Sequence, residues 1–135
     1  MLMKSSCTTS SPTSLCPHVL LQMTWSLAQK YCREQRIDLA TFRDSNDHDA
    51  LQNPCNYNRR CWIGLQRDEN DPNVWDCSDR EERSFTKWNH GLNQPDNNLG
   101  NKNCVATGTV RWYDSPCEDQ RRFLECKTKF VLIKV

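Results

Sequence analysis

The sequence is short of aliphatic residues, of glycine and of net charge. Leu, Ile, Val and Phe together supply 25 of 135 residues, glycine supplies four, and 18 Lys and Arg are balanced by 17 Asp and Glu. No stretch reaches the roughly 18 apolar residues that cross a bilayer, so we expect no membrane span. Without a basic excess, we expect no nucleic-acid binding driven by phosphate attraction. With so few glycines, the chain also lacks a Gly-rich phosphate loop.

In contrast to the small number of aliphatic residues, the sequence contains nine cysteines and five tryptophans. Such a density of cysteine is typical of a small domain held by disulfides in an oxidising compartment, so we predict an extracellular protein, either secreted or the ectodomain of a receptor. The odd count leaves at least one thiol free or paired outside the chain. There is no Cys-x-x-Cys pattern and no metal-ligand spacing among the three histidines, which argues against zinc. No nucleophile stands in a recognisable catalytic setting, so we predict that the chain is not an enzyme.

The chain divides into a tail, one domain and a short final segment. Residues 1–15 are rich in Ser and Thr, lack apolar periodicity and contain no signal-peptide core, so they are interpreted as a tail or linker. Residues 16–127 form the predicted domain. Residues 128–135 end in an apolar run that is similar to His18–Met23, and we interpret them as the first strand of a second, truncated copy. An ordinary final edge strand is the alternative.

Periodicity predicts two early helices followed by short strands. Thr24 is expected to cap a helix that runs to Gln35 and buries a stripe formed by Trp25, Ala28, Tyr31 and Cys32. Asp44-Ser45 is expected to cap a second short helix near Asn46–Leu51. Strands or short apolar segments are predicted at His18–Met23, Ile37–Phe42, Cys61–Leu65, from Asn73, and at Cys104–Thr107, Val110–Tyr113 and Arg122–Cys126. The region 79–103 has no periodicity and is predicted to be a long polar loop within an α+β fold.

An ordered set of motifs carries a family resemblance. The motifs are Trp25-Ser26-Leu27-Ala28, Asp38-Leu39-Ala40, Trp62-Ile63-Gly64-Leu65, Gln94-Pro95-Asp96, Trp112-Tyr113-Asp114 and Phe123-Leu124-Glu125-Cys126. In this order and with this cysteine spacing, the chain resembles a C-type lectin-like domain over about residues 16–127. The resemblance implies two short helices, small antiparallel sheets and a long irregular loop. It also implies that disulfides join Cys32 to Cys126 and Cys104 to Cys117.

The remaining cysteines leave alternatives open. Cys7 is a plausible partner for Cys16 in an N-terminal clasp. Cys61 either closes a tight loop with Cys55 or links neighbouring strands through Cys77.

The resemblance also implies a Ca²⁺ and sugar site on the long loop. Ca²⁺ takes about 6–8 oxygen ligands, and the motif order assigns Gln94, Asp96 and Asp114 as metal ligands in a galactose-type, cis-proline arrangement. The same three residues and Asn103 are the predicted carbohydrate-binding residues. Two positions depart from the motif, because Lys102 stands where relatives carry a glutamate and Tyr113 where they carry an asparagine. The predicted Ca²⁺ dependence is therefore weakened or lost.

These features lead to two functional hypotheses. The first is an extracellular lectin domain that binds glycans with terminal galactose or N-acetylgalactosamine, weakly at each site, as part of a tandem array. The alternative is a calcium-independent module of the same fold that binds a protein ligand. Two basic dipeptides, Arg59-Arg60 and Arg121-Arg122, are candidate spots for sulfated or sialylated partners or part of an ordinary solvated face.

Overall fold

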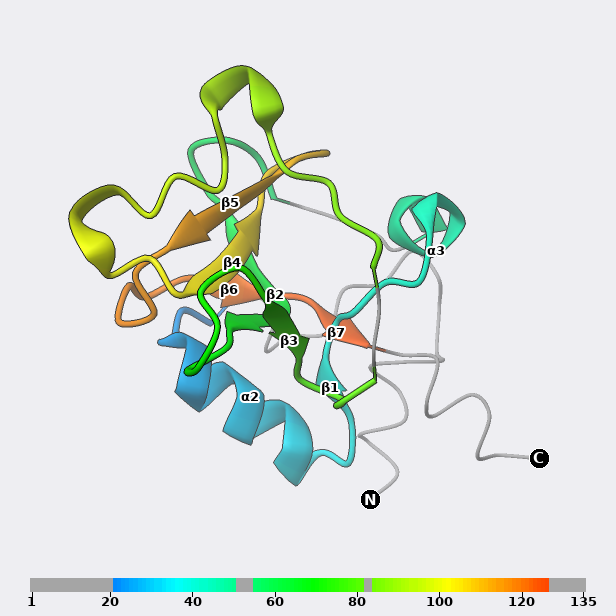
Figure 1. The fold of residues 1–135 in the computed structure, drawn as a ribbon. Coiled ribbons are helices and arrows are strands. Elements are labelled where there is room, and N and C mark those ends of the chain that lie inside the picture. Colours follow the sequence, from blue (N-terminus) through cyan, green and yellow to red (C-terminus); the bar gives the residue numbers. More distant parts are fainter. Residues whose placement is uncertain (1–20, 51–54, 82–83, 127–135) are drawn as a thin grey trace.

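The structure is a computed structural model that describes residues 21–50, 55–81 and 84–126 (Figure 1). The predicted tail (1–15), the Cys7–Cys16 clasp, the first half of the His18–Met23 segment and the final segment (128–135) lie outside the described residues. Of the predicted first strand, Met23 forms an isolated bridge with Arg121. Neither helix of the described part is long and apolar enough to cross a membrane.

Helix α2 (Trp25–Glu34) begins where the sequence predicts it. The hydroxyl of Thr24 accepts a hydrogen bond from the amide of Leu27, so one unpaired donor of the first turn is satisfied. Trp25, Ala28 and Cys32 are buried along one face, and the indole of Trp25 donates to the carbonyl of Ile63 at 2.8 Å. The predicted apolar stripe therefore joins the helix to the sheet.

Helix α3 (Ser45–Ala50) is short and has the predicted cap. The Asp44 carboxylate accepts from the amide of Asp47 at 2.9 Å. His48 points into the core, where its Nε2 accepts from the indole of Trp112 at 3.0 Å.

The strands form one main sheet and one two-stranded pair. Their bounds are β1 (Asp38–Leu39), β2 (Cys61–Arg67), β3 (Trp75–Cys77), β4 (Cys104–Thr107), β5 (Trp112–Ser115), β6 (Arg122–Phe123) and β7 (Glu125–Cys126). The main sheet is antiparallel in the order β3-β2-β4-β5, β6 pairs in parallel with β2, and β1 pairs with β7.

Two strand predictions are corrected. The single strand predicted at Arg122–Cys126 is two strands, because Leu124 bonds to different partners on its two sides: its amide to Trp62 and its carbonyl to Ala40. The strand predicted at 110–113 is shifted to Trp112–Ser115 because Gly108 and Arg111 close the preceding turn.

The core lies on both sides of β2. Successive residues of a strand face opposite sides, so Trp62 belongs to the cluster with α2 and Phe123, whereas Ile63 belongs to the cluster with Trp88 and Trp112. Large aromatic rings therefore supply much of the volume that the few aliphatic residues do not.

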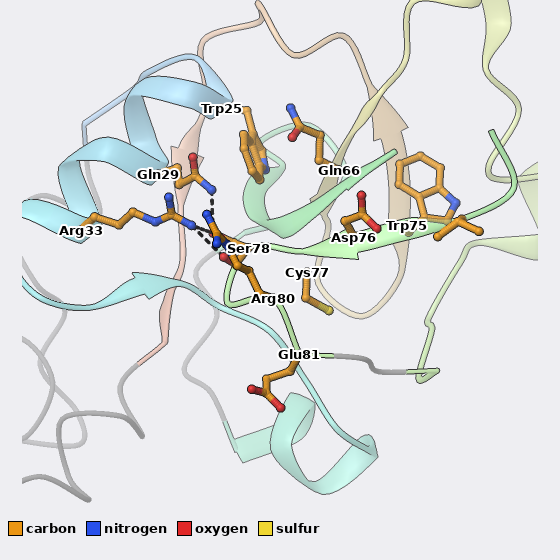
Figure 2. A pocket seen from close by; sticks show the side chains of 11 residues that line it. Trp25, Gln29, Arg33, Gln66, Trp75, Asp76, Cys77, Ser78, Arg80 and Glu81 are labelled. Carbon is orange, nitrogen blue, oxygen red and sulfur yellow. Dashed lines mark hydrogen bonds between the residues drawn. The ribbon is translucent and has the colours of Figure 1, made fainter. Parts of the chain in front are cut away.

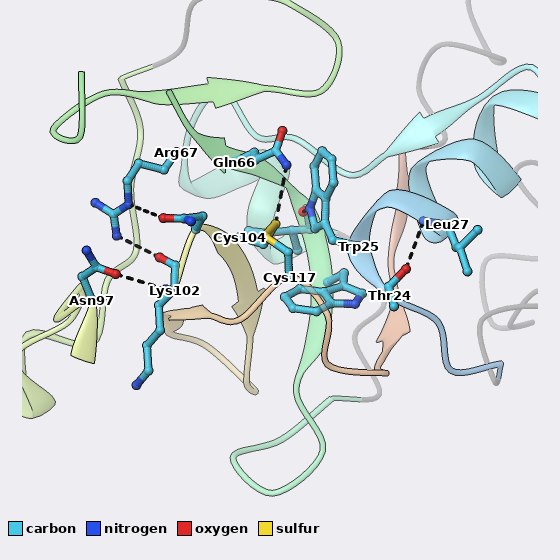
Figure 3. Close-up of a disulfide and its surroundings, with 12 residues drawn as sticks. Thr24, Trp25, Leu27, Gln66, Arg67, Asn97, Lys102, Cys104 and Cys117 are labelled. Atoms are coloured by element: carbon cyan, nitrogen blue, oxygen red, sulfur yellow. Dashed lines mark hydrogen bonds between the residues drawn. A yellow bond between two sulfur atoms is a disulfide. The ribbon is translucent and has the colours of Figure 1, made fainter. Parts of the chain in front are cut away.

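Two disulfides fix the ends of the irregular segments. Cys55 is bonded to Cys61, which resolves the alternative left open by the sequence, and Cys104 is bonded to Cys117 as the resemblance implies. The carbonyl of Cys117 accepts from the amide of Trp25 at 3.1 Å, so this bridge also holds the start of α2 (Figure 3). For the expected Cys32–Cys126 bond, the backbone of Cys126 pairs with Asp38, but its side chain lies outside what is described, so this bond stays a prediction.

The long loop lies between β3 and β4, as the lack of periodicity predicts. It contains two single-turn 3-10 helices, η2 (His90–Leu92) and η3 (Asn98–Gly100). The amide of Trp112 donates to Lys87 and its carbonyl accepts from Asn89, so the loop is held along β5. Figure 1 shows the loop, yellow-green to yellow, projecting beyond the sheet around β4 and β5.

Candidate ligand-binding loop

Three predicted site residues meet at the base of the long loop. Gln94 Nε2 donates to Asp96 Oδ2 at 3.2 Å, and Gln94 Oε1 accepts from the amide of Asp114 at 3.1 Å. The Gln94–Pro95 bond is cis, as the resemblance implies. Residues from the loop and from β5 therefore form one polar cluster, which we call the Gln94 cluster (Gln94, Asp96 and Asp114).

Asp114 is the buried member of the Gln94 cluster. Its side chain is fully covered, and its two oxygens accept from the amides of Asp96 at 3.3 Å and Asn97 at 2.7 Å. Burial raises the pKa of this carboxyl, while the two backbone hydrogen bonds act in the opposite direction. Asp114 thus serves as an anchor that holds the turn after Pro95 onto β5.

Asp96 is the accessible carboxylate, and a cation lies beside it. Lys102 Nζ is 3.4 Å from Asp96 Oδ1, with both side chains partly exposed. The pKa of Asp96 is lowered, first by the hydrogen bond from the amide of Asn98 and then by the charge of Lys102. Lys102, which stands where the resemblance places a glutamate, is therefore paired with the predicted site residue Asp96.

A second cation, Arg67, was not anticipated from the sequence. Its Nη2 lies 3.2 Å from Asp114 Oδ2 and 2.9 Å from the carbonyl of Lys102. Its Nε donates to Asn103 Oδ1 at 3.1 Å (Figure 3). Because Arg67 and Asp114 are 47 positions apart, no local pattern relates them.

Two named positions are placed outside the Gln94 cluster. Asn103, a predicted sugar contact, is exposed and its side-chain oxygen is bonded to Arg67. The hydroxyl of Tyr113 accepts from Asn89 Nδ2 at 2.9 Å, and its ring lies under the guanidinium of Arg60. The hydroxyl and the ring of Tyr113 therefore interact with Asn89 and Arg60, outside the Gln94 cluster.

The outer surface of the loop carries leucine rather than an aromatic ring. Leu99 is 87% exposed and has a left-handed backbone with φ 73°, and Leu92 is 49% exposed. The tryptophans at 62, 88 and 112 are buried, and Trp75 is partly buried beneath Arg67. Asn98 stands two positions after Asp96, so the loop offers no aromatic ring there for stacking on a sugar.

A separate hollow of about 670 Å³ lies between α2 and β3 (Figure 2). Three of the residues that line it form one network: Gln29 Nε2 donates to Ser78 Oγ at 2.9 Å and Arg33 Nη2 donates to the Ser78 carbonyl at 2.7 Å. Ser78 Oγ in turn donates to the buried carboxylate of Asp38. This network joins the helix to two strands and involves no predicted site residue.

Comparison with known proteins agrees with this arrangement. The family model described as "Lectin C-type domain" matches residues 21–128. The chain belongs to the C-type lectin family. It is 33% identical over 120 residues to C-type lectin BML-2 of Bungarus multicinctus, covering 79% of this chain and 72% of the relative. It is also 33% identical over 116 residues to lectoxin-Enh3 of Pseudoferania polylepis, covering 78% and 71%.

Solved structures confirm the fold of this C-type lectin domain. The carbohydrate-recognition domain of cow CD23 superimposes with a TM-score of 0.67 at 22% identity, covering 78% of this chain and 79% of that chain. That of the mouse scavenger receptor C-type lectin superimposes with a TM-score of 0.67 at 20% identity, covering 78% and 81%. At these identities the likeness concerns the fold alone.

The Gln94 cluster does not fit a calcium ion. The two carboxylates are already balanced by Lys102 and Arg67, so a dication would bring a net charge of about +2 into a partly buried site. The oxygen of Gln94 and those of both carboxylates accept hydrogen bonds from within the chain. Ca²⁺ takes about 6–8 oxygens, and Lys102 and Tyr113 stand at the two positions where the resemblance places further oxygen ligands.

Proposed function

We propose that this C-type lectin domain binds carbohydrate of the galactose type without calcium, through the Gln94 cluster and Lys102. It acts outside the cell as a recognition domain rather than as an enzyme. The observation that carries the proposal is the contact of 3.4 Å between Lys102 Nζ and Asp96 Oδ1, in a loop that retains the Gln-Pro-Asp order. Relatives named as lectins support carbohydrate as the ligand class, as do the carbohydrate-recognition domain of cow CD23, solved in the presence of an oligosaccharide, and murine dendritic cell inhibitory receptor 2, solved in complex with an N-glycan.

An ammonium group can take over part of the role that a metal ion plays toward sugar hydroxyls. Lys102 has three N–H donors, of which one faces Asp96, so others are available to hydroxyl oxygens. Asp96 and Gln94 provide acceptors and an amide donor beside it. Adjacent hydroxyls of one sugar thus meet a donor and an acceptor at the same place.

Such a site binds weakly on its own. It is partly exposed to water, where each net hydrogen bond contributes about 0.5–1.5 kcal/mol. Useful binding then needs several such domains acting together.

A protein partner is the second candidate, and the exposed leucines favour it. Leu99 extends into solvent from a left-handed backbone position, and Leu92 lies on the same loop. Apolar side chains surrounded by polar ones are typical of protein interfaces. In this case Leu99, rather than Lys102, dominates binding.

Retention on immobilised galactose tests the first proposal. We expect wild-type protein to be retarded equally with calcium and with a chelator, and Lys102→Ala to abolish the retardation. Lys30→Ala, an exposed change on α2, serves as the control and leaves it unchanged. If the chelator abolished retention on the galactose resin, the proposed calcium independence would be wrong. No retention under either condition would overturn the sugar assignment in favour of the protein partner.

A further inference from the structure

Four arginines from two distant dipeptides line one pocket. The pocket has a volume of about 310 Å³, and Arg59, Arg60, Arg121 and Arg122 contribute to its wall. The first pair begins at the last residue of the turn at 56–59, and the second ends at the first residue of β6, where Arg122 pairs with Cys61 of β2. The sheet therefore joins two basic spots that are separated by more than sixty positions in the sequence.

Two of these guanidinium groups are held in place by aromatic rings. Arg60 lies 3.7 Å above the ring of Tyr113, and its Nε donates to the carbonyl of Tyr57 at 3.1 Å. Arg121 lies 5.4 Å from the centre of the Trp62 ring. Both guanidinium groups are thus preorganised before any ligand arrives, which reduces the entropic cost of binding.

The pocket has an excess of positive charge over the acidic groups that pair with it among the described residues. Asp119 pairs with Arg121 at 3.0 Å, and within the described residues Arg59 and Arg122 form no ion pair. The Nε of Arg121 is buried and has no hydrogen-bond partner among those residues. Burial lowers the pKa of Arg121, and the charge of Arg60 acts in the same direction. An anion in the pocket would balance the positive charge of these guanidinium groups.

Carboxamide groups complete the wall of this arginine pocket. Gln22, Asn58 and Gln120 line it together with the arginines, and all three are exposed. A carboxamide both donates and accepts, which matches sugar hydroxyls, whereas guanidinium groups bind the oxygens of tetrahedral anions with paired N–H donors. The near-zero net charge of the chain argues against a nucleic acid.

We propose that the arginine pocket is a second ligand site, separate from the Gln94 cluster, that binds a sulfate group carried on a saccharide. The guanidinium groups bind the sulfate and the carboxamides bind neighbouring hydroxyls. The proposal does not depend on the proposed galactose site, because none of the Gln94-cluster residues lines this pocket.

Calorimetric titration of the chain with a sulfated heparin tetrasaccharide tests this site. The double variant Arg59→Gln/Arg122→Gln is compared with Lys30→Gln/Arg36→Gln, which removes the same charge from exposed positions outside the pocket. We expect the pocket variant to weaken binding about tenfold for each guanidinium removed, and the control to change it little. Lys102→Ala should leave the affinity for the sulfated tetrasaccharide unchanged. The arginine-pocket proposal and the galactose proposal can therefore fail independently of each other.

Further measurements separate a sulfated saccharide from other ligands of the arginine pocket. A desulfated tetrasaccharide of the same length should bind at least tenfold more weakly. In ¹⁵N NMR of the wild-type chain, the Nε–H signal of Arg121 should shift on titration, which requires no variant. Equal losses in the pocket and control variants would show charge attraction without a site and overturn the proposal. A sulfotyrosine peptide that binds as well as the saccharide would overturn the sugar assignment.

Discussion

Arg67 Nη2 lies 3.2 Å from Asp114 Oδ2, and this contact joins β2 to β5 beneath the long loop. The same guanidinium donates to the carbonyls of Pro72 and Lys102 and to the side chain of Asn103. A fixed cation of the chain thus ties together a turn, the end of the loop and the anchor carboxylate. These contacts support our proposal that the loop is ordered without a bound ion.

Replacing Arg67 should loosen the contacts beneath the long loop and destabilise the domain. Arg67→Gln leaves the fully covered Asp114 carboxylate without its cation, and removing one partner of a buried pair costs about 3 kcal/mol. Urea unfolding measures the loss. Arg43→Gln breaks the exposed pair with Asp47 and serves as a control that should cost less than about 1 kcal/mol. Equal effects of the two variants would contradict the anchoring role of Arg67.

Restoring a carboxylate at position 102 should create calcium affinity. Lys102→Glu removes the cation beside Asp96 and adds an oxygen donor, so we expect calcium to raise the melting temperature of this variant. Lys102→Gln is the matched control, because it removes the cation without adding a carboxylate. If calcium stabilises neither variant, our placement of Lys102 in the ancestral ion site is wrong.

Stability should depend on pH through His48. Its Nε2 accepts from Trp112, so the folded state holds the neutral ring, and burial, assisted by Lys87, lowers its pKa from 6.5. Because the unfolded chain then binds a proton more readily, this contribution to stability is complete above about pH 6.5 and is lost as the pH falls. His48→Gln should flatten this part of the profile, whereas His90→Gln, at an exposed position, should not. An unchanged slope in His48→Gln would contradict the prediction.

Gly64 should tolerate no side chain. A Cβ there would lie 2.9 Å from Thr41 Cγ2 and 3.0 Å from the Leu39 carbonyl, where β2 passes the segment after β1. Gly64→Ala should therefore cost roughly 1–3 kcal/mol in thermal or urea unfolding. Gly91→Ala, whose nearest neighbour would be 3.4 Å away, should change stability little. A larger loss for Gly91→Ala than for Gly64→Ala would refute this packing argument.

Local signals predicted much of the fold. The caps at Thr24 and Asp44 depend on neighbouring residues and are confirmed, and so is the buried face of α2, except that Tyr31 is only partly buried. Strand 122–126 was predicted as one element because its division at Leu124 depends on hydrogen bonds to Trp62 and Ala40, which are distant in the chain.

Only those site residues that belong to the family motifs could be predicted from the sequence. Gln94, Asp96 and Asp114 come together as the resemblance implies. The contribution of Arg67, and the joining of Arg59-Arg60 to Arg121-Arg122 in one pocket, arise from strand pairing that no local pattern encodes.

Calcium titration tests the central claim most directly, namely that Lys102 and Arg67 replace the ion of the loop. We predict no saturable heat on titrating the wild-type chain with CaCl₂, and the same melting temperature in millimolar calcium and in chelator. Saturable binding with a Kd below about 1 mM, the range of extracellular calcium modules, would contradict the claim if Asp96→Asn abolished it.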